Sequence, residues 1–178
     1  MGRHSKSQFP HTYEQAAEIL QSSRTGRRYG YFNFHGVRNT ALREEQDPDL
    51  GSVFHMRLYS TNVVTFLPNG HAILRDGGWK TVTTKSRMNA CGFPVCTGPG
   101  RYWWVGCSIY VEGIILDSDQ EPLGVEGYGG SIQSYMDDVR DIGRDIVQGR
   151  KFRHLDDGIK WRLLLWAVSE SQAAPAVA

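Results

Sequence analysis

The chain has 178 residues, of which 40% are hydrophobic and 11% aromatic, and its formal net charge is +1 at pH 7. This composition suffices for one domain with a buried core and excludes an intrinsically disordered chain. No apolar run approaches the roughly 18 residues of a membrane helix, and the N-terminal stretch lacks the apolar segment of a signal peptide. We therefore expect a soluble intracellular protein without a membrane partner.

Charged residues are segregated along the chain despite the nearly neutral total. Lys and Arg predominate in residues 1–43 and 71–104, whereas Asp and Glu predominate in residues 44–70 and 105–145. If the two basic segments share one face, the protein presents a surface for a polyanion. If they pair with the acidic segments, the segregation reflects internal complementarity only.

The first predicted element is a helix over residues 12–22. Thr12 and Gln15 have the spacing of a capping box, and the apolar residues that follow recur on one side of a helix. We expect this helix to end near Gly26, because glycine is a common stop signal.

The next feature is the stretch RRYGYFNFHG, in which two arginines precede four aromatic residues. Its spacing nearly fits the RNA-stacking signature of an RNA recognition motif, but an arginine occupies the glycine position and only one helix precedes it. These departures argue against that fold. The stretch is therefore either an aromatic core strand or a surface on which unpaired bases stack. The candidate nucleic-acid-binding residues are Arg27, Arg28, Tyr29 and Tyr31.

Residues 53–74 change to the two-residue period of a β-hairpin. The segments VVTFL and HAILR flank Asn69 and Gly70, a pair typical of two-residue turns. Such a turn places Phe66 opposite Ile73 across the two strands.

The stretch GGWKTVTTKSRMNA over residues 77–90 combines glycines, hydroxyl groups and cations with few apolar side chains. It predicts a turn anchored by Trp79, followed by a short helix capped by Thr83 or Thr84. A capped helix start among cations is a candidate anion site, and the alternative is a solvated face without function. The candidate nucleic-acid or anion-binding residues are Lys80, Thr83, Thr84, Lys85, Arg87 and Asn89.

The clearest helix is predicted over residues 131–148, where apolar residues recur at helical spacing and Gly149 follows as a stop signal. Its polar side forms either an ordinary salt-bridged surface or an acidic face for a protein partner. The candidate partner-binding residues are Asp137, Asp138, Asp141 and Asp145. Residues 159–165 favour a strand, with a short helix as the alternative, and residues 169–178 are expected to form a disordered tail.

Metal-binding and catalytic patterns are weak. The three cysteines lack the paired spacing of a structural zinc site. The acidic stretch DSDQEPLG alternates as calcium loops do, but Pro122 stands where such a loop needs glycine. His154 beside two aspartates is a minimal acid–base cluster. We therefore expect no metal and no cofactor, and we consider an enzyme the least favoured class.

These elements together predict an α+β fold. Its centre is a small twisted antiparallel sheet from residues 53–116, with an N-terminal helix and a C-terminal amphipathic helix packed on it. We expect one domain over residues 1–168, with a β-rich core over residues 36–117 and the helix at 131–148 packed against that core.

Residues 36–117 resemble a group of small bacteriophage-encoded proteins of unknown function. The resemblance is carried in chain order by GVRNTALRE, the segment from FHMRLYS to TTKSRMN, GRYWWV and YVEGIILD. Its most specific part is Gly77–Asn89, which fits the pattern GGW(K/R)TxTTKxRxN. The sequence departs from the pattern at Tyr59, where we expect His. The resemblance implies a phage accessory protein and implies no activity.

The sequence therefore predicts a non-enzymatic phage accessory protein that binds a host or phage macromolecule. Nucleic acid or a nucleic-acid-handling protein is the expected target, and the host cytoplasm is the expected location. The alternative is a structural or assembly component of the virion. An enzyme acting on nucleic acid or nucleotides is the second alternative.

Overall fold

The computed structural model describes residues 9–98, 102–106 and 108–126 of the chain. The predicted helix at 131–148 with its acidic face, the strand at 159–165 and the tail lie outside these residues. The described elements are α1 (Tyr13–Ser22), α2 (Arg24–Tyr29), β1 (Tyr31–Asn33), β2 (Thr40–Asp47), β3 (Gly51–Leu58), β4 (Thr61–Phe66), β5 (Ala72–Leu74), α3 (Val82–Ala90), β6 (Val95–Thr97), β7 (Trp103–Val105), β8 (Ser108–Ile109), β9 (Ile114–Leu116) and β10 (Pro122–Val125). Among the described helices, none is long and apolar enough to cross a membrane.

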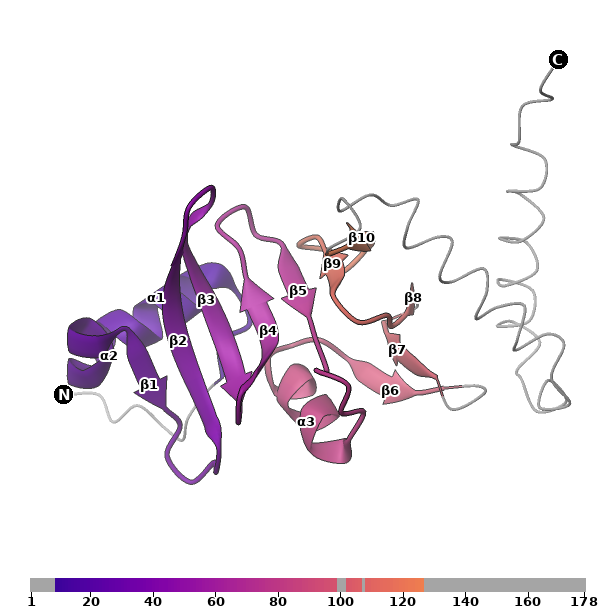
Figure 1. Ribbon diagram of the computed structural model, residues 1–178, viewed down its shortest axis with the longest axis horizontal. Coiled ribbons are helices and arrows are strands. Elements are labelled where there is room, and N and C mark those ends of the chain that lie inside the picture. The colour runs from indigo at the N-terminus through magenta and orange to yellow at the C-terminus, as the bar shows by residue number, and fades with distance from the viewer. Residues whose placement is uncertain (1–8, 99–101, 107, 127–178) are drawn as a thin grey trace, which may run out of the picture.

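The strands form two antiparallel sheets, so the predicted α+β architecture is confirmed for the described residues (Figure 1). The large sheet has seven strands in the order β1-β2-β3-β4-β5-β9-β10. Helix α3 and the small sheet β6-β7-β8 are inserted between β5 and β9, which are neighbours in the large sheet. The large sheet extends beyond the predicted residues 53–116, because β1 and β2 join one side and β10 joins the other.

One face of the large sheet is covered by α1. Thr12 caps this helix as predicted, since its hydroxyl accepts a hydrogen bond from the Gln15 N–H. Ala16 and Leu20 are buried in the main core, and the ring of Tyr13 lies 4.7 Å from that of Phe54 on β3. The apolar side of the helix therefore packs on the apolar face of the sheet.

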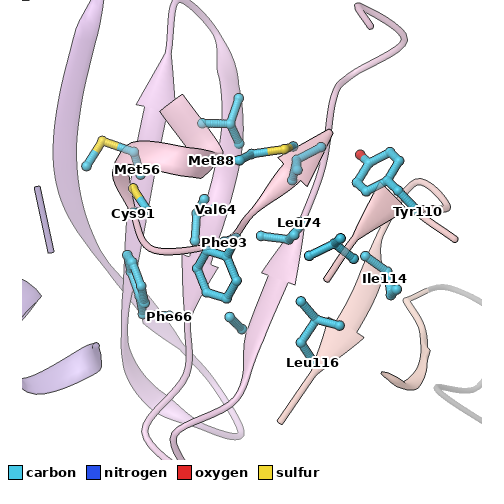
Figure 2. Close-up of a cluster of buried hydrophobic side chains, with 14 of the residues drawn as sticks. Met56, Val64, Phe66, Leu74, Met88, Cys91, Phe93, Tyr110, Ile114 and Leu116 are labelled. Atoms are coloured by element: carbon cyan, nitrogen blue, oxygen red, sulfur yellow. The ribbon is translucent and has the colours of Figure 1, made fainter. Parts of the chain in front are cut away.

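The same face of the sheet continues under α3 (Figure 2). Met88, Cys91 and Phe93 pack there against side chains from β3, β4 and β5. Burial raises the pKa of the Cys91 thiol far above its ordinary value, so Cys91 is an unreactive core residue. The sheet residues of this layer are Leu42, Phe54, Met56, Leu58, Val64, Phe66, Leu74, Ile114 and Leu116.

The β4–β5 hairpin differs by one residue from the predicted register. Phe66 pairs with Ala72, whereas the sequence placed it opposite Ile73. The loop has three residues, because the Leu67 N–H donates to the His71 carbonyl and only Gly70 has a positive φ in the turn. A two-residue turn would pair Pro68 with His71 at the end of the hairpin. Pro68 has no N–H, so it could not donate the backbone hydrogen bond that closes the hairpin.

Helix α3 forms where it was predicted, but its cap is Thr81 and not Thr83 or Thr84. Thr81 has extended backbone angles, and its hydroxyl accepts a hydrogen bond from the Thr84 N–H at 3.2 Å. Thr84 lies inside the helix, where its buried hydroxyl donates to the Trp79 carbonyl at 2.9 Å. The capping residue precedes the first helical residue, which is Val82.

This assignment predicts different effects for two neighbouring threonines. Thr81→Ala should lower the free energy of unfolding by about 1 kcal/mol, because it removes the acceptor for the Thr84 N–H. Thr83→Ala should leave that free energy within about 0.5 kcal/mol of wild type, because Thr83 is exposed. Urea denaturation measures both, and equal losses in the two variants would contradict the assigned cap.

Candidate nucleic-acid interface

The face of the large sheet opposite α1 and α3, here called the open face, carries polar side chains on β1 to β4. Residues paired across antiparallel strands share a face, and successive residues alternate between faces. One row across the open face is Tyr31, Arg43, His55, Thr65, Ile73 and Ile115. The adjacent row is Asn33, Ala41, Arg57 and Asn62.

A chain of polar contacts crosses the open face from β5 to β2. Arg75 Nη1 donates to Thr65 Oγ1 at 3.0 Å, and Thr65 Oγ1 lies 2.9 Å from His55 Nδ1. His55 Nε2 lies 3.3 Å from Glu45 Oε2, and Arg75 Nε donates to Glu126 at 2.7 Å. Arginine can only donate, so the Thr65 hydroxyl can direct its own proton to His55 Nδ1. The His55 proton then lies on Nε2, facing Glu45.

His55 is held in its neutral form by this environment. Burial lowers the pKa of His55 below its ordinary value, and the nearby Glu45 carboxylate only partly opposes that effect. A neutral imidazole satisfies both of its neighbours without placing a charge inside the sheet. The polar contacts therefore hold the open face in place, and His55 does not supply a cation for a ligand at neutral pH.

A shallow depression of about 730 Å³, here called the open-face depression, lies at the β1 side of this chain. Its lining includes two arginines, two tyrosines and two asparagines, and none of the described lining residues carries a carboxylate. Such a lining combines positive charge with aromatic surface and amide groups. The lining residues are Tyr31, Asn33, Val37, Asn39, Thr40, Ala41, Arg43, Arg57 and Tyr59.

Two residues of this depression have left-handed backbone conformations. Asn39 has φ 56° and Tyr59 has φ 54°. The Tyr59 N–H donates to the Asn39 carbonyl at 2.8 Å, and Arg57 Nε donates to the Tyr59 carbonyl at 3.0 Å. A positive φ is unusual for an aromatic residue, yet the Tyr59 side chain is 70% exposed. Tyr59 and Ser60 form the two-residue turn between the paired residues Leu58 and Thr61, which accounts for the positive φ and leaves the tyrosine ring in solvent.

Of the aromatic and basic residues predicted in RRYGYFNFHG, the structure places Tyr31 in the depression. Arg27, Arg28 and Tyr29 lie on α2, and the Arg28 guanidinium lies 5.1 Å from the exposed Tyr29 ring. Phe34 from the same stretch is buried in the core. The burial of Phe34 agrees with the core interpretation, and base stacking on the exposed residues stays a prediction.

The predicted residues of the Gly77–Asn89 stretch contact different parts of the protein. Thr83 is exposed, and Thr84 is buried within α3. Lys80 Nζ lies 5.8 Å from the Tyr110 ring, and Lys85 Nζ lies 5.6 Å from the Trp103 ring. Arg87 Nε donates to Thr40 Oγ1 at 2.8 Å. The Asn89 side-chain amide donates to the Val95 carbonyl. Trp79, predicted as a buried anchor, is instead 70% exposed.

Sequence reasoning missed Arg43, Arg57 and Tyr59 as candidate site residues. Arg43 belongs to the stretch ALREEQ, in which two apolar residues precede four polar ones, so no two-residue period marks it as a strand. Its pairing with Tyr31 depends on the β1–β2 hairpin, which was not predicted. Tyr59 was noted only as a departure from a pattern, because a sequence does not show a backbone angle.

The Kyanoviridae Gp96 protein family matches residues 27–105 of the chain. This range contains all lining residues of the open-face depression. The match supports a bacteriophage-encoded protein, in agreement with the resemblance found in the sequence. No curated protein and no solved structure shows a significant match to the chain.

The lowered pKa of His55 predicts a pH dependence of stability. The unfolded chain binds a proton at His55 near pH 6.5, whereas the folded protein binds it only at lower pH. The stabilisation from neutral His55 is therefore complete above about pH 6.5 and is lost as the pH falls below that value. His55→Gln should lose less stability than wild type between pH 7.5 and 5 in urea denaturation. The same pH dependence in both proteins would contradict the neutral imidazole.

Proposed function

We propose that this phage-encoded protein binds single-stranded nucleic acid through the open-face depression. The observation that carries the proposal is Tyr59, an exposed aromatic residue kept in a strained backbone conformation beside two arginines. The proposal agrees with the function expected from the sequence and moves its centre from Lys80, Lys85 and Arg87 to the open face.

The charge of the depression suits a phosphate backbone. Arg43 is exposed and Arg57 is half-buried, and both line a surface without a carboxylate. A guanidinium group binds phosphate oxygens through paired N–H donors. Because the net charge of the chain is only +1, attraction to a polyanion depends on this local concentration of positive charge.

The aromatic rings favour a single strand over a duplex. Tyr31 and Tyr59 line the depression, and bases can stack on such rings only when they are not paired within a helix. The side-chain amides of Asn33 and Asn39 add donors and acceptors for base edges or sugars. The shallow shape of the depression also suits an extended strand better than an enclosed small molecule.

The strain at Tyr59 gives a test that separates binding from folding. Tyr59→Gly should match or exceed wild type in the free energy of unfolding, because glycine adopts a positive φ without steric cost. The same variant should bind a fluorescent oligothymidine roughly tenfold more weakly in an anisotropy titration, because one stacking ring is lost. Tyr29→Ala removes an exposed tyrosine outside the depression and should bind as wild type does. An unchanged affinity of Tyr59→Gly would contradict the proposal.

The salt dependence of binding tests the two arginines. The double variant Arg43→Gln, Arg57→Gln should reduce the slope of log affinity against log salt by about 0.7 for each lost phosphate contact. The matched variant Lys80→Gln, Lys85→Gln removes the same charge from the Gly77–Asn89 stretch and should leave the slope closer to wild type. If wild type shows no salt-dependent binding at low ionic strength, the proposal is wrong.

A further inference from the structure

A second hollow, here called the Trp79 groove, lies next to the turn between β3 and β4. Its volume is about 410 Å³, and Tyr59 lines both this groove and the open-face depression. Its lining combines two aromatic rings with several hydroxyl groups, two aliphatic side chains and the carboxyl group of Asp76. The lining includes Tyr59, Trp79, Thr61, Thr81, Thr83 and Thr84.

The backbone of Trp79 is tightly held although its side chain is exposed. The Trp79 N–H donates to the Asp76 carbonyl at 3.0 Å. The Trp79 carbonyl accepts hydrogen bonds from the Thr81 N–H at 2.8 Å and from the Thr84 hydroxyl at 2.9 Å. Three hydrogen bonds thus fix the position from which the indole projects into solvent.

A polar network around Glu112 holds the backbone of residues 76–78, which precede Trp79. The Glu112 carboxylate accepts hydrogen bonds from the Asp76 N–H at 2.6 Å, the Gly77 N–H at 3.0 Å and the Tyr110 hydroxyl at 2.9 Å. Asp76 itself is buried and accepts a hydrogen bond from the Gly78 N–H at 2.7 Å. The loop is therefore ordered by groups that do not include the Trp79 side chain.

Gly77 brings the same loop against the start of β4. It has φ 62°, and a Cβ atom at this position would lie 2.7 Å from Thr61 Oγ1. Only glycine combines this backbone angle with this close approach. The Trp79 loop is thus held beside the segment that follows Tyr59.

These hydrogen bonds order the loop that carries Trp79 and the turn that carries Tyr59, yet both aromatic rings stay exposed. Ordering a loop costs conformational entropy, and an exposed indole returns little stability through burial. The same ordering lowers the cost of binding a ligand, because the backbone that carries each ring is already in place. Two exposed aromatic rings on an ordered backbone beside one groove suit a ligand with a flat apolar surface.

The two hollows differ in charge, and this difference suits two different parts of one ligand. The open-face depression contains Arg43 and Arg57, which suit phosphates. Among the described residues, the Trp79 groove is lined by no lysine or arginine, and its one charged-type side chain is the buried Asp76. The hydroxyls of Thr81 and Thr84 bond within the protein, whereas the exposed Thr83 hydroxyl can donate to or accept from any base edge. We propose that the Trp79 groove binds an unpaired nucleobase of the same strand whose phosphates contact Arg43 and Arg57. This inference rests on the proposed function, and Tyr59 joins the two sites.

The test is a set of oligothymidines of about twelve nucleotides that carry one abasic residue at successive positions. For wild type, the abasic residue at the position that occupies the groove should weaken binding roughly tenfold in an anisotropy titration at low salt. Trp79→Ala should bind the intact oligonucleotide roughly tenfold more weakly and should lose nothing more at that position, because base and indole stack on each other. Its denaturation midpoint should equal that of wild type, because Trp79 is exposed.

Trp79→Phe is the matched control, because it keeps a stacking ring and removes the exposed indole. It should bind within about threefold of wild type but lose the quenching of tryptophan fluorescence that the oligonucleotide causes. If Trp79→Ala binds every oligonucleotide as wild type does while the arginine variant is weakened, this inference fails and the proposed function stands. The inference is also overturned if the affinity loss from Trp79→Ala and the affinity loss from the abasic residue add at every position of that residue. If wild type binds no oligonucleotide, both proposals fail.

Discussion

The register of β2, β3 and β4 is the constraint on which the rest of the structure depends. Leu42, Phe54 and Met56 are buried under α1 and α3, and this burial decides which residues of the same strands face the other way. A shift of one residue would turn Arg43 and Arg57 into the apolar core. The hydrophobic effect on one side of the sheet therefore positions the polar residues on the other side.

The open face keeps this register while carrying buried polar groups. His55 and Thr65 lie in the middle of the sheet, where an unpaired polar atom would be destabilising. Their contacts with Arg75 and Glu45 satisfy both, and they link β2, β3, β4 and the residue after β5 through side chains. These side-chain contacts therefore help to fix the geometry of the open-face depression beside them.

The proposed phosphate and base contacts meet at Tyr59, in the turn that joins β3 and β4. The register of these strands shifts between Met56 and Arg57, because Val63 on β4 has no partner on β3, so the ladder is irregular next to the turn. A bulge of this kind alters the local twist and redirects side chains. The strained turn presents the tyrosine ring between the arginines of the open face and the indole of Trp79.

The sequence by itself determined the local elements whose signals lie within a few residues of each other. The Thr12 cap, the α3 helix and the β4–β5 hairpin all follow from turn chemistry and short-range periodicity. The hairpin register was wrong by one residue because Pro68 acts through its missing N–H, which matters only once the two strands pair. The similarity to phage proteins was also visible in the sequence, and it covers the segment that forms the candidate site.

Only the tertiary structure decided which charged and aromatic residues share a surface. Lys80, Lys85 and Arg87 are neighbours in the sequence, yet their side chains contact Tyr110, Trp103 and Thr40. Arg43 and Arg57 are far apart in the sequence and line one depression, because antiparallel pairing brings β2 against β3. A functional surface depends on these long-range pairings and on backbone angles such as that of Tyr59, which no local pattern of residues specifies.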